Sequence, residues 1–198
     1  MPRPTISPAL LDTSPDIICL LDSALRIVYC NPAWDRFAAD NEGRACSTSS
    51  VMGTPMLDSI PEALARFFRT AFALVRESGE PFEFDYECSS ALVFRMFRMR
   101  ILPIAGAGEF MVVHSLRVER PHDRPAVEPD DARFRGQNGL IVICCHCCRT
   151  RRAAEPQLWD WVPDYVASRP APVSAGICSA CFAYFYPEIF AQRCSAAG

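Results

Sequence analysis

Two pairs of cysteines near the C-terminus have the spacing of metal ligands. Cys144 and Cys147 form one C-x2-C pair, and Cys178 and Cys181 form the other. Such a pair bends the chain so that both sulfur atoms point the same way, and two pairs complete a tetrahedron around one ion. Four thiolates leave no open coordination position, so the spacing predicts a structural zinc site. The same cysteines could hold a single iron ion or an iron–sulfur cluster, which the spacing does not exclude.

Other reactive groups surround the first pair. Cys145 and Cys148 are additional thiols, and a metal or the adjacent arginines would lower their pKa values, so both are candidates for redox chemistry. His146 lies between the ligands, and we expect it to be exposed on the turn rather than bound to metal. The basic run 149–152 could contact phosphate. A solvated patch, or Arg151 paired with a carboxylate inside this region, is the alternative interpretation.

Composition limits the class of protein. The 198 residues suffice for one ordinary domain and a small one, and half of them are apolar. The chain has no hydrophobic signal core at its start and no apolar run of about 18 residues, so we expect a cytoplasmic protein without a membrane span. In that reducing compartment the 11 cysteines are thiols or metal ligands. The net charge of −3 argues against general nucleic-acid binding.

Periodicity predicts an α+β domain in the first part of the chain. Asn31 and Pro32 have the residue types of a helix cap and a first helical position, so a short helix should cover 33–40. A longer apolar-faced helix follows Pro61 and ends at Gly79. Together the elements form a five-stranded antiparallel sheet with helices on one face. The expected strands cover residues 17–22, 25–30, 82–88, 93–102 and 110–116.

Two sets of side chains follow from these elements. Acidic residues at 83, 85 and 87 should pair with arginines at 95, 98 and 100 on the solvated face of the sheet. Apolar residues on the other side are candidates for lining a ligand cavity, although such residues more often only fill a core. The candidate ligand-binding residues are Phe67, Phe68, Phe72, Phe84, Phe97 and Met99.

Composition also suggests domain boundaries. We expect a loose N-terminus over 1–15, a first domain over 16–118, a proline- and charge-rich linker over 119–138, and a cysteine-rich module over 139–198. A tail of this size cannot easily bury enough apolar surface without a metal ion. Within it we expect a strand before the first cysteine pair and a short helix that contains Trp159 and Val166.

The first domain resembles PAS domains. The residues that carry the resemblance are 16–22, 26–34 with the sequence Asn-Pro-Ala at 31–33, and 51–53 with the sequence Val-Met-Gly. The resemblance covers about 7–118. It implies a sensory or signalling role, since PAS domains commonly bind a small molecule between sheet and helices, dimerise, or pass a change of shape to an attached output.

The tail is similar to cysteine-rich segments at the C-termini of bacterial PAS and receiver-containing signalling proteins. The similarity covers about 140–190. The extra thiols Cys145 and Cys148 depart from the pattern and leave open which sulfurs bind. The residues that carry it are Ile143, Cys144, Cys147, Arg151, Trp159, Val162, Tyr165, Gly176, Ile177, Cys178, Cys181, Tyr186, Pro187 and Glu188.

These observations predict a bacterial sensory protein, expected to be a homodimer, whose zinc-bound tail docks a protein partner. No Gly-rich phosphate loop and no G-x-S-x-G sequence is present, so we do not expect an enzyme. One alternative is a redox or iron–sulfur sensor that uses the cysteines. Another is a nucleic-acid-binding regulator. The candidate partner contacts are Trp159, Trp161, Tyr184 and Phe185.

Overall fold

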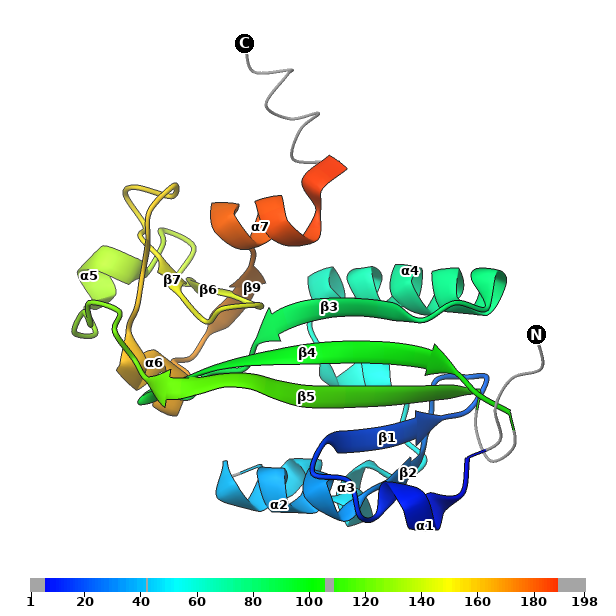
Figure 1. Cartoon of the computed structure of the whole chain (residues 1–198). Coiled ribbons are helices and arrows are strands. Elements are labelled where there is room, and N and C mark those ends of the chain that lie inside the picture. The colour runs from blue at the N-terminus through cyan, green and yellow to red at the C-terminus, as the bar shows by residue number, and fades with distance from the viewer. Residues whose placement is uncertain (1–5, 42, 106–108, 189–198) are drawn as a thin grey trace. The chain divides into compact units, whose positions relative to one another are not determined.

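The structure is a computed structural model that describes residues 6–41, 43–105 and 109–188. The chain forms two compact units (Figure 1). The first comprises Met1–Tyr86 and Met96–Val118, and the second comprises Glu87–Arg95 and Glu119–Gly198. Among the described residues, every helix is too short or too polar to cross a membrane.

The first unit is built on the predicted five-stranded antiparallel sheet. The strand order is β2-β1-β5-β4-β3, and β1 pairs antiparallel with both of its neighbours. The prediction of an α+β fold is therefore confirmed, since the same strands were expected from alternating apolar residues. The strands are β1 (Ile17–Leu21), β2 (Ile27–Cys30), β3 (Phe82–Glu87), β4 (Val93–Pro103) and β5 (Phe110–Pro121).

Helices cover one face of this sheet, and one short helix packs against the other. The core cluster with Cys19 and Leu21 of β1 contains apolar residues of α4, with others from α2 and α3 packed against it. Ile18 and Leu20 face the opposite way and pack with Leu11 of α1. The elements are α1 (Pro8–Leu11), α2 (Pro32–Asp40), α3 (Thr48–Val51), α4 (Glu62–Ser78) and two 3-10 turns at Arg44–Cys46 and Met56–Ser59.

The N-terminus differs from the expectation of a loose segment over 1–15. Residues 8–11 are helical, and the Leu11 side chain is buried in the second core cluster. Asn31 holds this region in place, because its Nδ2 donates hydrogen bonds to Leu11 O and Asp16 O. Residues 1–5 lie outside the described residues.

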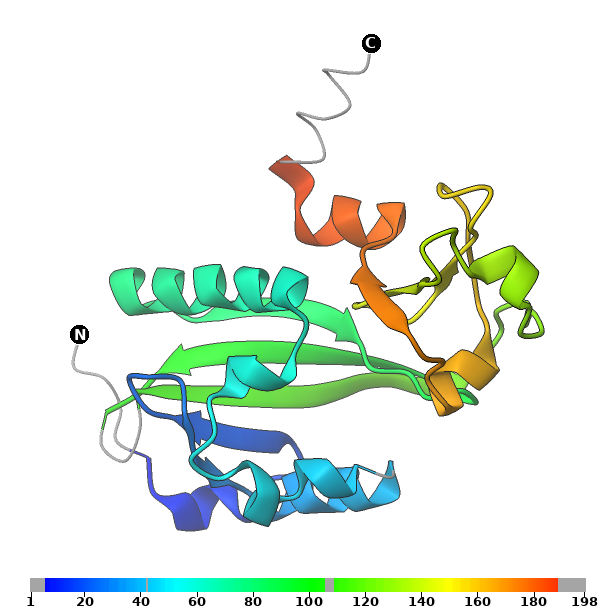
Figure 2. The same cartoon turned by 180° about the vertical axis from the view of Figure 1, so that it is seen from behind.

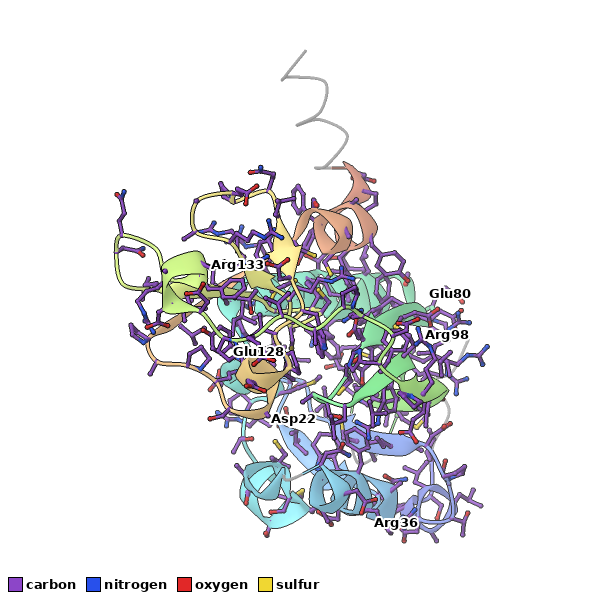
Figure 3. All side chains as sticks on the ribbon, turned by 90° about the vertical axis from the view of Figure 1, so that its left-hand side faces the viewer. Asp22, Arg36, Glu80, Arg98, Glu128 and Arg133 are labelled. Carbon is purple, nitrogen blue, oxygen red and sulfur yellow. The ribbon has the colours of Figure 1, made fainter. Side chains whose placement is uncertain are left out.

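Charged residues pair across β3 and β4 in part as expected. Arg98, labelled in Figure 3, donates from Nε and Nη2 to both carboxylate oxygens of Asp85 at 2.8 and 3.0 Å. The Arg98 guanidinium is also 3.8 Å from Glu83. Arg95 instead pairs with Glu119 of β5. Cross-strand ion pairs of this kind stabilise the solvated face only slightly.

The second unit contains a small sheet with the strand order β8-β7-β6-β9. Three of these strands, β6, β7 and β9, are labelled in Figure 1, and Figure 2 shows the same unit from behind. β6 and β9 are parallel, and the other two pairs are antiparallel. Its elements are α5 (Asp131–Phe134), β6 (Ile141–Cys144), β7 (Thr150–Arg151), β8 (Trp159–Asp160), α6 (Pro163–Ala167), β9 (Val173–Gly176) and α7 (Ser179–Phe185). Its core consists of Phe134, Ile141, Ile143, Val162 and Tyr165.

The segment expected as a linker, 119–138, belongs to this second unit. Phe134 is only 1% exposed and packs in the core, and Val127 N–H donates to Trp161 O at 2.9 Å. The small sheet supplies too little apolar surface by itself, so the preceding segment contributes to its core. The tip of the β3–β4 hairpin, Glu87–Arg95, also belongs to the second unit. There His122 N–H donates a hydrogen bond to Leu92 O at 3.1 Å.

The expected helix through Trp159 and Val166 is wrong at its start. Trp159 lies in β8, and the helix begins only at Pro163. Proline suits the first helical position because it has no N–H to leave unpaired. It also disfavours helical backbone at the residue before it, Val162, so a helix cannot readily run through this point.

Candidate metal centre

Four sulfur atoms converge in the second unit. The Sγ atoms of Cys144, Cys147, Cys178 and Cys181 all lie within 4.8 Å of one another, and three of these residues are buried. The Sγ atoms of Cys147 and Cys178 are 3.7 Å apart. In a tetrahedral site with Zn–S bonds of about 2.3 Å, neighbouring sulfurs are about 3.8 Å apart. The geometry and the all-sulfur donor set therefore fit one zinc ion.

Two parallel strands bring the cysteine pairs together. In the register of β6 and β9, Cys144 lies opposite Gly176. Because the strands are parallel, their C-terminal ends lie at the same end of the sheet. The first cysteine pair begins at the end of β6, and the second pair begins two residues after the end of β9. Gly176 has no room for a side chain, since a Cβ there would lie 2.6 Å from Val142 Cγ1 and 3.1 Å from the Trp159 ring.

Backbone hydrogen bonds shape both pairs. In the first, Cys148 N–H donates to Cys144 O at 3.0 Å, and Cys148 adopts a left-handed φ of 57°. In the second, Cys178 precedes α7, and its Sγ accepts a hydrogen bond from Cys181 N–H at 3.5 Å. Cys178 N–H donates to Cys144 Sγ at 3.4 Å, which links the two pairs directly. N–H donors aimed at sulfur favour the thiolate form, which is the form that binds metal.

Hydrogen bonds among the four thiols lower the pKa values of two of them and raise the pKa values of the other two. The hydrogen bond with Cys147 lowers the pKa of Cys144 to about 7, and hydrogen bonds with Cys144 and Cys147 lower the pKa of Cys178. Hydrogen bonds with Cys144 raise the pKa of Cys147 and of Cys181. A bound divalent cation would displace any protons that the four thiols carry and stabilise four thiolates.

His146 is buried, contrary to the expectation of an exposed residue. It is 8% exposed and stacks on Phe185 of α7, with ring centroids 3.9 Å apart. Burial lowers its pKa to about 4, and its Nε2 has no hydrogen-bond partner within the described part of the chain. The reason is tertiary, because α7 returns to the first cysteine pair and covers this ring.

The extra thiols lie outside the four-sulfur cluster. Burial raises the pKa of Cys145 to about 11 and also raises the pKa of Cys148. This direction is opposite to the one expected from neighbouring arginines, and a redox role for these thiols remains a prediction. In the basic run, Arg152 rather than Arg151 forms the ion pair with a carboxylate, since its Nε lies 2.8 Å from Asp160.

The aromatic residues expected at a partner interface have different environments. Trp161 is 4% exposed, and Trp159 packs against the cysteine cluster. Phe185 covers His146. Tyr184 is 58% exposed on α7. Of the four, Tyr184 therefore presents the most accessible ring to a partner, while Trp161 is a core residue.

In the first unit, the six candidate ligand-binding residues come together in one apolar region. Phe67 and Phe84 have ring centroids 4.9 Å apart, and both pack on the core cluster that contains Phe68, Phe72 and Met99. Phe97 is 2% exposed and joins this region through Tyr86, on whose ring it stacks. The role of the six residues in ligand binding remains a prediction.

Sequence reasoning missed a polar pair beside these rings. Tyr86 Oη lies 2.8 Å from His114 Nδ1, and the Tyr86 ring stacks on Phe97. Burial lowers the pKa of His114 to about 4, so the imidazole is neutral near pH 7. Both residues have the strand parity of the helix-covered face, which is the pattern that could have suggested the pair.

Comparison with known proteins identifies a family for the first unit. The family model described as PAS fold matches residues 11–121, which is more than half of the chain. A comparison with curated proteins found no match. The family match thus covers the five-stranded sheet and helices α2 to α4, and it ends before the cysteine cluster.

Solved structures with similarity to this chain include PAS domains of bacterial proteins. The chain shares 12% identity with the PAS domain of a Colwellia psychrerythraea protein, covering 55% of this chain and 92% of that one, with a TM-score of 0.42. The PAS domain of Bordetella pertussis BvgS has 22% identity, coverage of 57% and 84%, and a TM-score of 0.41. The photoactive yellow protein domain of the Rhodospirillum centenum sensor histidine kinase Ppr has 15% identity, coverage of 57% and 94%, and a TM-score of 0.40.

Proposed function

Because this chain belongs to the PAS fold family, we propose that it is a non-catalytic signalling protein whose second unit is built around one zinc ion. In this proposal the PAS domain responds to a small molecule or mediates dimerisation. The zinc-bound unit docks a protein partner. The observation that carries the proposal is the convergence of the four sulfur atoms of Cys144, Cys147, Cys178 and Cys181 within 4.8 Å.

Zinc would act as a structural staple. The four cysteines join the ends of β6 and β9 to the start of α7, so one ion would cross-link three elements that share only a small core. Zinc supplies positive charge and four bonds but no redox chemistry. Since such sites seldom exist in the unfolded chain, the free energy of metal binding becomes free energy of folding.

The docking role is supported by exposed apolar residues on the second unit. Tyr184 is 58% exposed on α7, immediately after the cysteine cluster, and Leu92 is 78% exposed at the hairpin tip. Tyrosine is enriched at protein interfaces, where its ring buries a large area and its hydroxyl stays paired. The proposal places the protein in the cytoplasm, because zinc thiolates are maintained in a reducing compartment. It also includes a homodimer, with the PAS domain as the part that dimerises.

Elemental analysis and native mass spectrometry of freshly purified protein test the metal and the oligomer together. We expect one zinc per chain, a colourless sample and the mass of a dimer. In the variant Cys178→Ser/Cys181→Ser the metal should be lost and the second unit should unfold. Cys145→Ser is the matched control, since this thiol lies outside the cluster, and it should retain the zinc.

Three outcomes contradict parts of this proposal. Full metal content and a folded second unit in the double variant would exclude the zinc staple. Iron with visible absorption would favour the iron–sulfur sensor. For docking, Tyr184→Ala should weaken cross-linking to a partner in cells while zinc content is unchanged, and equal cross-linking would argue against Tyr184 as a contact.

A further inference from the structure

Two cysteines in the first unit face each other across adjacent strands. Cys19 of β1 and Cys30 of β2 are direct partners in the antiparallel register. Their side chains lie on the same face of the sheet, since Cys19 belongs to the core cluster under the helices and Cys30 packs against that cluster. Neither residue is part of the metal centre.

The hydrogen-bond pattern determines what kind of pair this is. Asn31 N–H donates to Ile18 O at 3.0 Å, and Ile18 N–H donates to the side-chain Oδ1 of Asn31, so these two residues occupy a hydrogen-bonded position of the same register. Hydrogen-bonded and non-hydrogen-bonded pairs alternate, so Cys19 and Cys30 form a non-hydrogen-bonded pair. In such pairs the Cα atoms are about 4.5 Å apart, and a disulfide needs about 4.4–6.8 Å.

The two thiols differ in access. Cys19 is completely buried, whereas Cys30 is partly exposed. An oxidant from solvent therefore reaches Cys30 first, and Cys19 is positioned to react with the product. Burial raises the pKa of Cys30 to about 12 and also raises the pKa of Cys19. Both are thiols at neutral pH, so the pair stays reduced unless oxidant persists.

From this geometry we propose that Cys19 and Cys30 are a redox modification site, which a peroxide converts to a cross-strand disulfide. Cys30 first loses its proton to solvent, and the thiolate attacks hydrogen peroxide. The O–O bond breaks, and the hydroxide that leaves takes up a proton, so the products are a sulfenic acid and one water. Cys19 then loses its proton, its sulfur attacks the sulfur of Cys30, the S–O bond breaks, and the leaving hydroxide takes up that proton as a second water. Two thiols lose two protons and two electrons, and peroxide is reduced to two waters.

The disulfide would constrain the start of the PAS fold. It closes a loop that contains the turn at Asp22 between β1 and β2. Asn31, the residue after Cys30, caps α2 and bonds to β1. Oxidation therefore joins β1, β2 and the entry to α2 covalently. This site goes beyond the proposed zinc-dependent function. The two proposals rest on different cysteines, so a test of one does not decide the other.

Peptide mapping of the zinc-loaded full chain tests the proposal. Trypsin cleaves after Arg26, Arg36 and Arg44, so Cys19, Cys30 and the exposed Cys46 fall into three separate peptides. After treatment with excess hydrogen peroxide and alkylation of free thiols, we expect the Cys19 and Cys30 peptides to be joined, with the mass of two hydrogens lost. Reduction should separate them.

Matched variants make the result decisive. Cys46→Ser should retain the cross-link, whereas Cys19→Ser should abolish it and leave Cys30 as a sulfenic acid that a dimedone probe labels. Zinc content, measured in parallel, should not differ between the variants. The proposal is overturned if Cys30 joins Cys46 instead. It is equally overturned if Cys46 is oxidised while the Cys19 and Cys30 peptides remain separate.

Discussion

Glu87 and Arg124 form two parallel hydrogen bonds of 2.6 and 2.7 Å, although they are 37 residues apart in the sequence. Both side chains are largely buried, with exposures of 10% and 15%. The Arg124 guanidinium also lies over the rings of Phe94 and Trp161, at 5.4 and 5.2 Å. Within the second unit, this one arginine therefore connects the hairpin tip, the segment after β5 and Trp161, the residue directly after β8.

Replacing Glu87 by Gln should destabilise the second unit. The substitution keeps the shape but leaves the buried Arg124 charge without its counter-ion, at a cost of about 2–3 kcal/mol. Denaturant unfolding measures the loss, and hydrogen exchange should show faster exchange at 119–127. Glu83→Gln is the control, because Glu83 is 56% exposed and 3.8 Å from Arg98, and it should cost less than about 1 kcal/mol. Equal losses in both variants would contradict this role.

Asn31→Ala should be among the most destabilising single changes in the PAS domain. The buried side chain accepts hydrogen bonds from Ile18 N–H and Trp34 N–H and donates to Leu11 O and Asp16 O. Its removal leaves buried backbone groups unpaired, at about 1–3 kcal/mol each, so we expect a loss of about 3 kcal/mol in urea unfolding. Asn41→Ala removes one bond, to Phe37 O, and should lose less than half as much.

Gly176→Ala should disturb the candidate metal centre through packing. The new Cβ would overlap Val142 Cγ1 and press on the Trp159 ring. We expect a loss of about 2–3 kcal/mol and weaker zinc retention against a chelator. Val142→Ala removes the closest atom, so the double variant should lose less stability than the sum of the single variants. Simple additivity would mean that the overlap at Val142 is not the cause.

Acid should destabilise the PAS domain through His114. Burial lowers its pKa to about 4, whereas an unfolded histidine has a pKa of about 6.5. Between these values the unfolded state binds more protons, so stability falls as pH decreases from 6.5 to 4, by a total on the order of 3 kcal/mol. In His114→Phe this contribution disappears. Urea midpoints at pH 7 and 5 check it, and identical pH dependence in both proteins would refute it.

Chelation should unfold the second unit selectively. The cysteine cluster and its neighbouring core are separate from the core clusters of the five-stranded sheet. Hydrogen exchange with a strong chelator present should therefore show lost protection in β6, β9 and α7, and unchanged protection in β1 and the paired part of β5. Added zinc should restore it. Protection that is independent of the chelator would contradict a metal staple.

Many elements of the first unit can be predicted from the sequence, because they depend on short-range interactions. The cap at Asn31, the stop of α4 at Gly79 and the alternating strands each depend on a residue and its near neighbours, and the structure confirms them. Gly79 adopts a φ of 73°, the left-handed conformation that favours glycine. The convergence of the four cysteines could also be anticipated, because two C-x2-C pairs have one common geometric solution.

Other features depend on contacts between distant segments. The polar and proline-rich neighbours of Phe134 predict a linker, yet Phe134 packs with Tyr165 and Ile141. The local sequence predicts that His146 is exposed, but α7 returns to it and covers the ring. Local composition carries no information about which remote surface needs an apolar partner, so such assignments fail.

By itself, the sequence predicted the elements of the PAS fold and the four cysteines whose sulfur atoms converge, since both predictions follow from spacing along the chain. Only the tertiary structure decided that Glu87 meets Arg124 and that the hairpin tip belongs to the second unit. It also placed Cys19 opposite Cys30, because a register shift of one residue would have turned one thiol to the other face. Strand pairing and register are properties of the folded chain, because they are set when apolar surfaces from distant segments are buried against one another.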